Sequence, residues 1–244
     1  MNLEPWQWAL AIAGALLVGI SKTGIAGIGM LFVVIFAQIL PAKQASGVVL
    51  PLLICGDIFA VTAYRRHADW THLWRLFPWA ALGVLIGFVA LGRIDDRQAR
   101  LLVGVIILAL LGLHVVRRMR SKSDEPEHAA WFAPSIGVLA GFTTLVANAA
   151  GPLMAIYLLA MRLPKMEFVG TGAVFFLLLN LFKVPFMAGL GLINAQSLLL
   201  NAVLVPAVIV GALIGRAILT RINQKLFETL ALVLSAAAGV RLLW

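Results

Sequence analysis

Two short polar stretches, each set between apolar runs, carry the residues that could do chemistry. The first covers residues 19–29 and reads Gly-Ile-Ser-Lys-Thr-Gly-Ile-Ala-Gly-Ile-Gly. A helix that begins here presents free backbone N–H groups and partial positive charge, and Lys22 adds a full charge. Glycines let the backbone approach a ligand closely. The stretch therefore predicts a site for a small anion, such as a sulfur oxyanion or a carboxylate. The predicted residues are Ser21, Lys22, Thr23, Gly24, Gly27 and Gly29.

The second stretch covers residues 141–152 and reads Gly-Phe-Thr-Thr-Leu-Val-Ala-Asn-Ala-Ala-Gly-Pro, which offers hydrogen-bond donors without charge. We expect Lys22 and two helix N-termini to hold the anion. We expect its oxygens to accept hydrogen bonds from Thr23, Thr143 and Asn148. The alternative is structural: the glycines allow close helix packing, Lys22 reaches the membrane surface and Asn148 caps a helix. The residues predicted from this stretch are Thr143, Thr144, Asn148, Gly151 and Pro152.

Three further polar residues stand inside long apolar runs, namely Asp57, Asn180 and Lys183. Ionisable groups at membrane depth are costly and usually mark a binding site, a proton relay or an ion pair. Asp57 could pair with Lys22 or with Lys183, or it could accept a coupling proton. A purely structural pair between helices is the other interpretation. We assign the three residues to charge balance and coupling.

Other kinds of site lack the residues they require. The four histidines are scattered along the chain, and Cys55 is the one cysteine. The sequence contains no HExxH, nucleophile elbow, paired carboxylates or Walker loop. We therefore expect no enzyme activity, no cofactor and no metal ion.

The elements that position these residues follow from composition. The chain has 244 residues, of which 62% are hydrophobic and 12% charged, with a mean hydropathy of +1.02. Soluble domains have about 45–50% apolar residues, so we expect an all-α polytopic membrane protein. We assign the net charge of +9 to cytoplasmic loops rather than to nucleic-acid binding. The expected partners are the lipid bilayer and a small anion; homo-oligomers stay open.

Ten apolar runs divide into two groups of about four to five membrane segments around one polar stretch. We expect an N-terminal membrane repeat at 1–116, a cytoplasmic linker at 117–130 and a C-terminal membrane repeat at 131–244. Residues 6–20 would form about 22 Å of helix, short of the roughly 30 Å hydrocarbon core, and residues 150–161 are shorter still. These segments predict half-helices or re-entrant hairpins whose tips carry the site. The ten runs are 6–20, 24–40, 46–64, 73–92, 99–116, 131–147, 150–161, 168–189, 197–219 and 226–244.

The two groups resemble each other in sequence. Gly19-Ile-Ser matches Gly141-Phe-Thr, Asp57-Ile-Phe matches Asn180-Leu-Phe, and prolines and glycines recur in the same order. Such internal repeats are common in secondary transporters. The connection at 65–72 is basic, whereas its counterpart near 189–196 carries no charge, so the two lie on opposite sides of the membrane. The sequence therefore predicts two inverted repeats.

Several short motifs resemble the sulfite exporter (TauE/SafE-like) family of membrane permeases, and the resemblance covers essentially the whole chain. The motifs are Ser21-Lys-Thr-Gly, Tyr64-Arg-Arg-His, Leu163-Pro-Lys, Phe168-Val-Gly-Thr and Asn180-Leu-Phe-Lys. The resemblance implies an inner-membrane transporter of sulfite, sulfonates or related organosulfur anions. The chain has Asn148-Ala-Ala-Gly-Pro where the family often has His-Ala-Gly-Gly-Pro. If that histidine carries a proton in the family, Asn148 cannot.

These observations predict a permease for small anions that works by alternating access between its two halves. The alternatives are a channel-like pathway for anions or protons and a transporter of small carboxylates.

Overall fold

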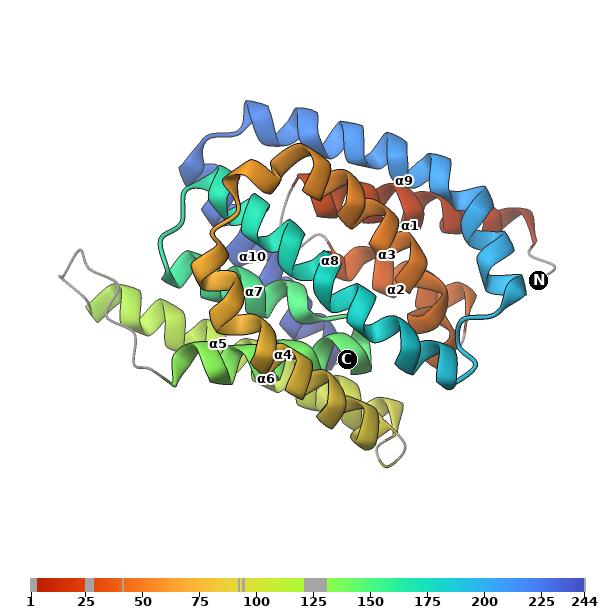
Figure 1. The fold of residues 1–244 in the computed structure, drawn as a ribbon, viewed down its shortest axis with the longest axis horizontal. Coiled ribbons are helices and arrows are strands. Elements are labelled where there is room, and N and C mark those ends of the chain that lie inside the picture. The colour runs from red at the N-terminus through yellow and green to blue at the C-terminus, as the bar shows by residue number, and fades with distance from the viewer. Residues whose placement is uncertain are drawn as a thin grey trace.

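The computed structural model describes residues 4–24, 29–40, 42–91, 93, 95–120 and 131–243, and this part of the chain is helical throughout, without strands (Figure 1). The all-α prediction is confirmed. Gly27 and residues 121–130 of the predicted linker lie outside the described residues. The helices are α1 (Pro5–Thr23), α2 (Gly29–Ile39), α3 (Ala42–Tyr64), α4 (Trp70–Leu91), α5 (Asp96–Arg120), α6 (Phe132–Ala147), α7 (Ala150–Ala160), α8 (Lys165–Gly189), α9 (Ala195–Arg221) and α10 (Gln224–Leu243), with a 3₁₀ turn at Arg65–His67.

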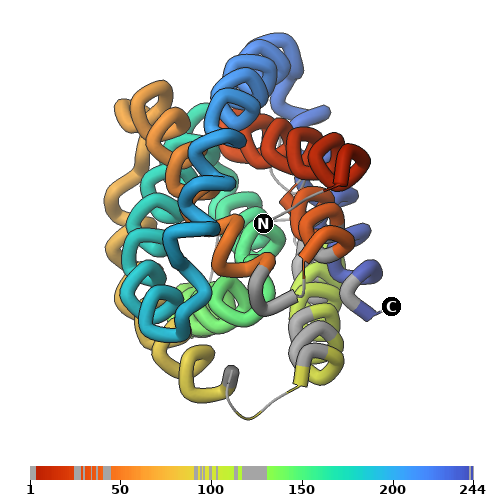
Figure 2. Tube along the Cα trace, turned by 90° about the vertical axis from the view of Figure 1, so that its right-hand side faces the viewer, coloured from red at the N-terminus to blue at the C-terminus, as the bar shows by residue number. Residues whose placement is uncertain are grey.

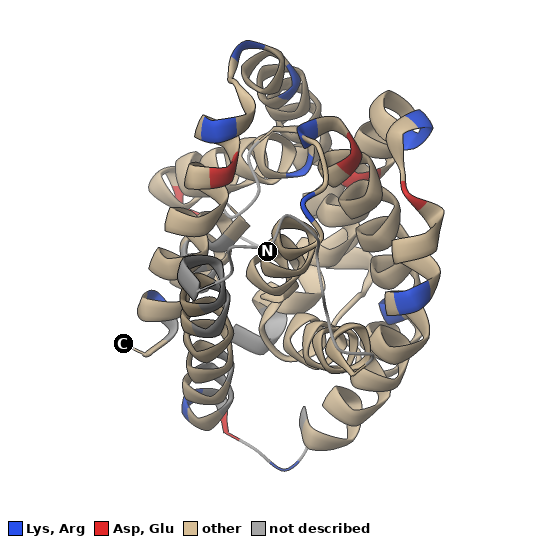
Figure 3. Ribbon diagram, turned by 90° about the vertical axis from the view of Figure 1, so that its left-hand side faces the viewer, with Lys and Arg blue, Asp and Glu red and all other residues tan. Residues whose placement is uncertain are grey.

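Each predicted apolar run corresponds to one helix. Within the described residues, four stretches are long and apolar enough to cross a membrane: Ala45–His67, Trp70–Ala90, Lys165–Gly189 and Ala195–Arg221. Charged side chains lie mostly near helix ends and connections, and long stretches between them are uncharged (Figure 3). Helix α5 continues to Arg120, so the first residues assigned to the linker are helical.

Of the two segments expected to be short, 150–161 is the short helix α7, but 6–20 is the 19-residue helix α1. The short helices of the structure are α2 and α7. Each has 11 residues, which gives about 16 Å of helix against a hydrocarbon core of about 30 Å. Helix α1 ends just before α2, and α6 ends just before α7, and in each pair the second helix folds back along the first as a hairpin. Phe36 of α2 lies against Gly14 of α1, and Tyr157 of α7 stacks on Phe132 of α6. Backbone breaks at membrane depth are tolerated where they are buried in protein or line a cavity.

The two halves exchange equivalent partners. Helix α1 packs along α9, and its counterpart α6 packs along α4, while α3 packs against its own counterpart α8 (Figures 1 and 2). Helices α5 and α10 form the remaining pair of equivalents. Within the described residues, the five α-helices of each half follow the same order and pack against equivalent helices of the other half. This packing agrees with a duplicated chain, and the inverted orientation of the two halves stays a prediction.

Glycines at equivalent positions make the closest helix contacts. A Cβ atom on Gly19 would lie 2.1 Å from the carbonyl oxygen of Val208, and one on Gly141 would lie 1.9 Å from that of Ala80. No side chain fits at such distances, so the helix backbones touch directly, as is common in membrane helix pairs. Equivalent contacts are made from the opposite helices by Gly83 and Gly211.

Candidate functional site

A cavity of about 100 Å³ lies between the turns of the two helix hairpins, α1–α2 and α6–α7. That volume exceeds the space for one water molecule several-fold, so the cavity has room for a small ion. Its walls are the ends of α1 and α6, the starts of α2 and α7, and the middle of α3 and α8. The lining residues are Ser21, Lys22, Gly24, Gly29, Phe32, Leu53, Asp57, Thr144, Asn148, Gly151, Pro152, Met154, Ala155, Leu158, Phe168, Val169, Gly172, Ala173, Phe176 and Asn180.

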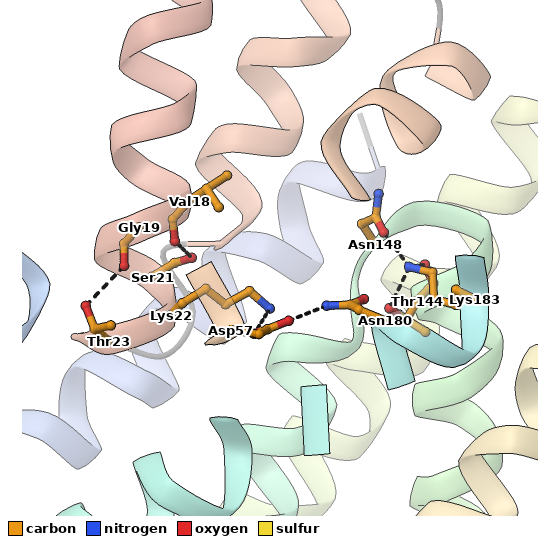
Figure 4. A network of polar contacts seen from close by, with 10 residues as sticks. All are labelled: Val18, Gly19, Ser21, Lys22, Thr23, Asp57, Thr144, Asn148, Asn180 and Lys183. Carbon is orange, nitrogen blue, oxygen red and sulfur yellow. Dashed lines mark hydrogen bonds and ion pairs between the residues drawn. The ribbon is translucent and has the colours of Figure 1, made fainter. Parts of the chain in front are cut away.

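Lys22, Asp57 and Asn180 form a continuous polar chain in this cavity (Figure 4). Lys22 Nζ lies 2.8 Å from Asp57 Oδ1, and Asn180 Nδ2 donates a 2.6 Å hydrogen bond to Asp57 Oδ2. Asp57 is fully buried, whereas the Lys22 side chain keeps 11% of its surface accessible. Of the two pairings expected for Asp57, the structure forms the one with Lys22. Lys22 Nζ also lies 4.5 Å from the ring centroid of Phe176.

Asp57 and Asn180 occupy equivalent positions in the two repeats. Their hydrogen bond therefore connects one repeat to the other through the same position in each. It lies where α3 packs against α8. A carboxylate and an amide suit this place, because the amide can donate to the carboxylate and two carboxylates would repel.

Lys183 lies on α8 and contacts the C-terminal end of α6. Its Nζ donates to the Thr144 carbonyl at 2.9 Å, to Thr144 Oγ1 at 3.3 Å and to Asn148 Oδ1 at 2.7 Å (Figure 4). The Thr144 carbonyl also accepts from the Asn148 N–H. The end of a helix carries partial negative charge, so a buried ammonium is well placed at the end of α6. Lys183 does not line the cavity, but Thr144 and Asn148 do.

Asn148 ends α6 and shapes the turn into α7. It has a left-handed backbone with φ of 50°, a conformation that Asn tolerates better than most residues. Its Nδ2 donates to Ser46 Oγ in α3 at 3.2 Å. Both ends of this amide are therefore engaged by protein, and the side chain connects α8, through Lys183, to α3.

Helix α7 begins at the cavity without a side-chain cap on its N-terminus. Gly151 and Pro152 of its first turn line the cavity, and a Cβ on Gly151 would meet nothing within 4 Å. The partial positive charge of this helix end therefore faces open space near Lys22, as expected for an anion site.

Thr23 and Thr143 do not reach the cavity. Thr23 Oγ1 donates to the carbonyl of Ala212 in α9 at 2.6 Å, and Thr143 Oγ1 donates to that of Ala140 at 3.3 Å. Both side chains are buried. The structure thus uses Thr23 to join α1 to α9 and gives neither hydroxyl a path to an anion in the cavity.

Sequence reasoning missed the apolar part of the lining and one support of the first tip. Phe32, Leu158, Phe168 and Phe176 line the cavity, but apolar residues in an apolar chain give no signal. The Tyr64 hydroxyl donates to the Thr23 carbonyl at 3.0 Å and so holds the end of α1. The Tyr64-Arg-Arg-His motif was the sequence feature that could have drawn attention to Tyr64.

Chemically, the cavity offers an ammonium group, amide and hydroxyl groups and a helix N-terminus. Across the described ranges there is no group of three or more His, Cys, Asp or Glu residues that could hold a metal ion. The arrangement can bind and release an anion, and its carboxylate competes for the same ammonium.

Comparison with known proteins agrees with this geometry. The model of the sulfite exporter TauE/SafE family matches residues 11–242, which is nearly the whole chain. Searches of curated proteins and of solved structures gave no match. The family match, the apolar membrane-length helices and the two helix hairpins around a charged cavity lead to one assignment. This multi-pass membrane protein belongs to the TauE/SafE sulfite exporter family of transporters.

Proposed function

We propose that the protein is an inner-membrane permease for small anions, namely sulfite, sulfonates or related organosulfur compounds, and that it works by alternating access. The observation that carries this proposal is Lys22, an ammonium group that lines the cavity beside an uncapped helix N-terminus. Neither an enzyme activity, a cofactor nor a nucleic acid is part of this function, and the lipid bilayer is the second partner.

Lys22 has two competing anionic partners in this mechanism. In the structure it pairs with Asp57 at 2.8 Å. An anion that enters the cavity takes over part of the ammonium's hydrogen bonds, and the buried Asp57 then loses its compensating charge. A buried carboxylate without a partner is costly, and it is relieved when the carboxylate takes up a proton. Anion binding and proton uptake are coupled in this way.

The inverted halves supply the second part of the mechanism. In such transporters one half moves against the other around a fixed midplane site. Here the fixed site is the contact between Asp57 and Asn180, which lies between the halves. We infer that the anion remains near Lys22 while access changes from one side of the membrane to the other.

The test is the flux of sulfite and of sulfoacetate into proteoliposomes, with and without a pH gradient, for the wild type and Lys22→Gln. We expect saturable, gradient-dependent flux in the wild type and its loss in Lys22→Gln. Lys165→Gln is the matched control, because Lys165 Nζ contacts only backbone carbonyls at the end of α9, away from the cavity lining. Lys22→Arg keeps the charge and should retain part of the flux.

Unchanged affinity in Lys22→Gln would contradict the proposed anion site. Flux that does not saturate, at rates far above those of carriers, would indicate a channel-like pathway. Flux of acetate or another small carboxylate, without sulfite or sulfoacetate flux, would make the protein a carboxylate transporter.

A further inference from the structure

The cavity is polar at one end and apolar at the other. On α8 its lining runs from Asn180 through Phe176 to Phe168. Lining positions about four residues apart form a stripe on one face of the helix. From Asn180 to Phe168 the stripe covers roughly 18 Å along the axis. Asn180, at one end of the stripe, belongs to the polar chain with Lys22 and Asp57. The lining residues from Phe176 to Phe168 are apolar.

Helix α7 has the same direction of change. Its open N-terminus at Gly151 is the polar end, and Met154 and Leu158, each about one turn further on, are apolar. The two stripes face the same cavity. We call Met154, Leu158, Phe168 and Phe176 the apolar wall.

The apolar wall begins directly beside the ammonium group. Phe176 contributes its ring, whose centroid is 4.5 Å from Lys22 Nζ, and the other members of the wall continue away from Asp57. An anionic group on Lys22 that carried a carbon chain would therefore have apolar surface next to that chain. A bare oxyanion would leave the wall facing water.

We propose that the site prefers organic anions with a short, unbranched apolar body over bare inorganic oxyanions, and that Leu158 and Phe176 set this preference. The inference rests on the proposed anion transport. Each methylene group removed from water strengthens binding by up to about fourfold. The preference should grow with chain length until the cavity is filled.

The experiment is inhibition of radiolabelled sulfite flux in proteoliposomes by methane-, ethane-, propane- and butanesulfonate. These probes share one head group and differ only in the number of methylene groups. We expect the inhibition constant to fall two- to fourfold with each added carbon in the wild type. Leu158→Ala and Phe176→Ala should flatten the series, because each removes apolar surface that faces the alkyl chain.

Two controls separate the apolar wall from general effects. Phe182→Ala removes a phenylalanine from α8 that does not line the cavity, and it should retain the wild-type series. Leu158→Ala tests the wall from α7, whereas Phe176→Ala also removes the ring that lies 4.5 Å from Lys22 Nζ. A series that Phe182→Ala flattens as much as Leu158→Ala would contradict a specific wall.

Failure of this inference differs from failure of the proposed function. Sulfite flux that depends on Lys22, together with equal inhibition constants for all four alkanesulfonates, would overturn the preference. Anion transport would remain in place. Absence of flux or inhibition with every anion, sulfite included, overturns both.

Discussion

At the scale of single residues, Asp57 connects the anion site to proton coupling. It has one oxygen on Lys22 and the other on Asn180, and it is fully buried. Asn in its place would keep a similar shape but neither compete for the ammonium as a charge nor take up a proton.

Asp57→Asn is therefore expected to separate binding from coupling. Anion affinity should rise several-fold, because Lys22 loses its competing carboxylate, while the stimulation of flux by a pH gradient should disappear. Sulfite binding and flux, measured with and without the gradient, check both effects. A variant that keeps full gradient stimulation would show that another group carries the proton.

Lys183 should matter for stability more than for affinity, because its own side chain does not line the cavity and its three acceptors lie at the end of α6. Lys183→Met leaves the Thr144 carbonyl and Asn148 Oδ1 without this donor. We expect a loss of about 1.5–3 kcal/mol in unfolding free energy. Thermal unfolding in detergent measures it, with the peripheral Lys165→Met as the control. Equal destabilisation by both changes would contradict a special role for the buried contact.

At this scale, polar and charged residues stand out against an apolar background. Of those predicted from the sequence, Lys22, Asp57, Thr144 and Asn180 line the cavity, and their role in anion binding stays a prediction. The prediction also included Thr23, whose hydroxyl the structure directs to α9. Spacing along a helix does not tell which neighbour a hydroxyl will meet, because that depends on helices distant in sequence.

At the scale of helices, the glycine contacts decide how closely the halves approach. Gly141→Ala would place a Cβ atom 1.9 Å from the Ala80 carbonyl oxygen. The backbones of α4 and α6 would have to separate, at a cost of about 1–3 kcal/mol, as for overpacking in a core.

The expected result for Gly141→Ala is a clear drop in thermal stability in detergent. Gly112→Ala is the matched control: it lies inside α5, and its Cβ would meet nothing within 4 Å. In this variant the higher helix propensity of Ala should leave stability unchanged or slightly higher. Gly141→Ala with the stability of Gly112→Ala would contradict the direct backbone contact.

Helix positions were largely predictable, because apolar runs and their interruptions mark where the chain enters and leaves the membrane. The shortness of residues 150–161 predicted α7, whereas residues 6–20 form part of the 19-residue α1 and the short helix of that half is α2. The continuation of α5 to Arg120 was not predicted. Arg and Met are good helix formers, so a charged stretch can extend a helix beyond the membrane.

At the scale of the whole molecule, the cavity is asymmetric although the fold is a repeat. It follows α8 from Asn180 to Phe168, yet Leu50 of α3, the position equivalent to Ala173 of α8, is completely buried and does not line it. The repeated sequence could predict the two halves but not which of them holds the open path, because both carry the same pattern.

Alternating access predicts that the equivalent path opens when the halves exchange conformations. In a Cys55→Ala background, Ala173→Cys should react with a membrane-impermeant thiol reagent from the side of the basic 161–165 connection. Leu50→Cys should react only from the opposite side and only when anion and pH gradient drive turnover. Val18→Cys, fully buried and away from the cavity, should stay unreactive. Leu50→Cys protected under every condition would contradict this route.

The hydrogen bond between Asp57 and Asn180 has a consequence for the ancestry of the chain. If two separate, identical halves assembled about the same axis, one residue type would face itself there. Two aspartates would repel, and two asparagines would provide no carboxylate. Joining the halves in one gene allows each copy to mutate alone, so that a negative group and its uncharged donor can occupy the two sides. Fusion of the duplicated halves is thus what makes a single titrating carboxylate on the axis attainable.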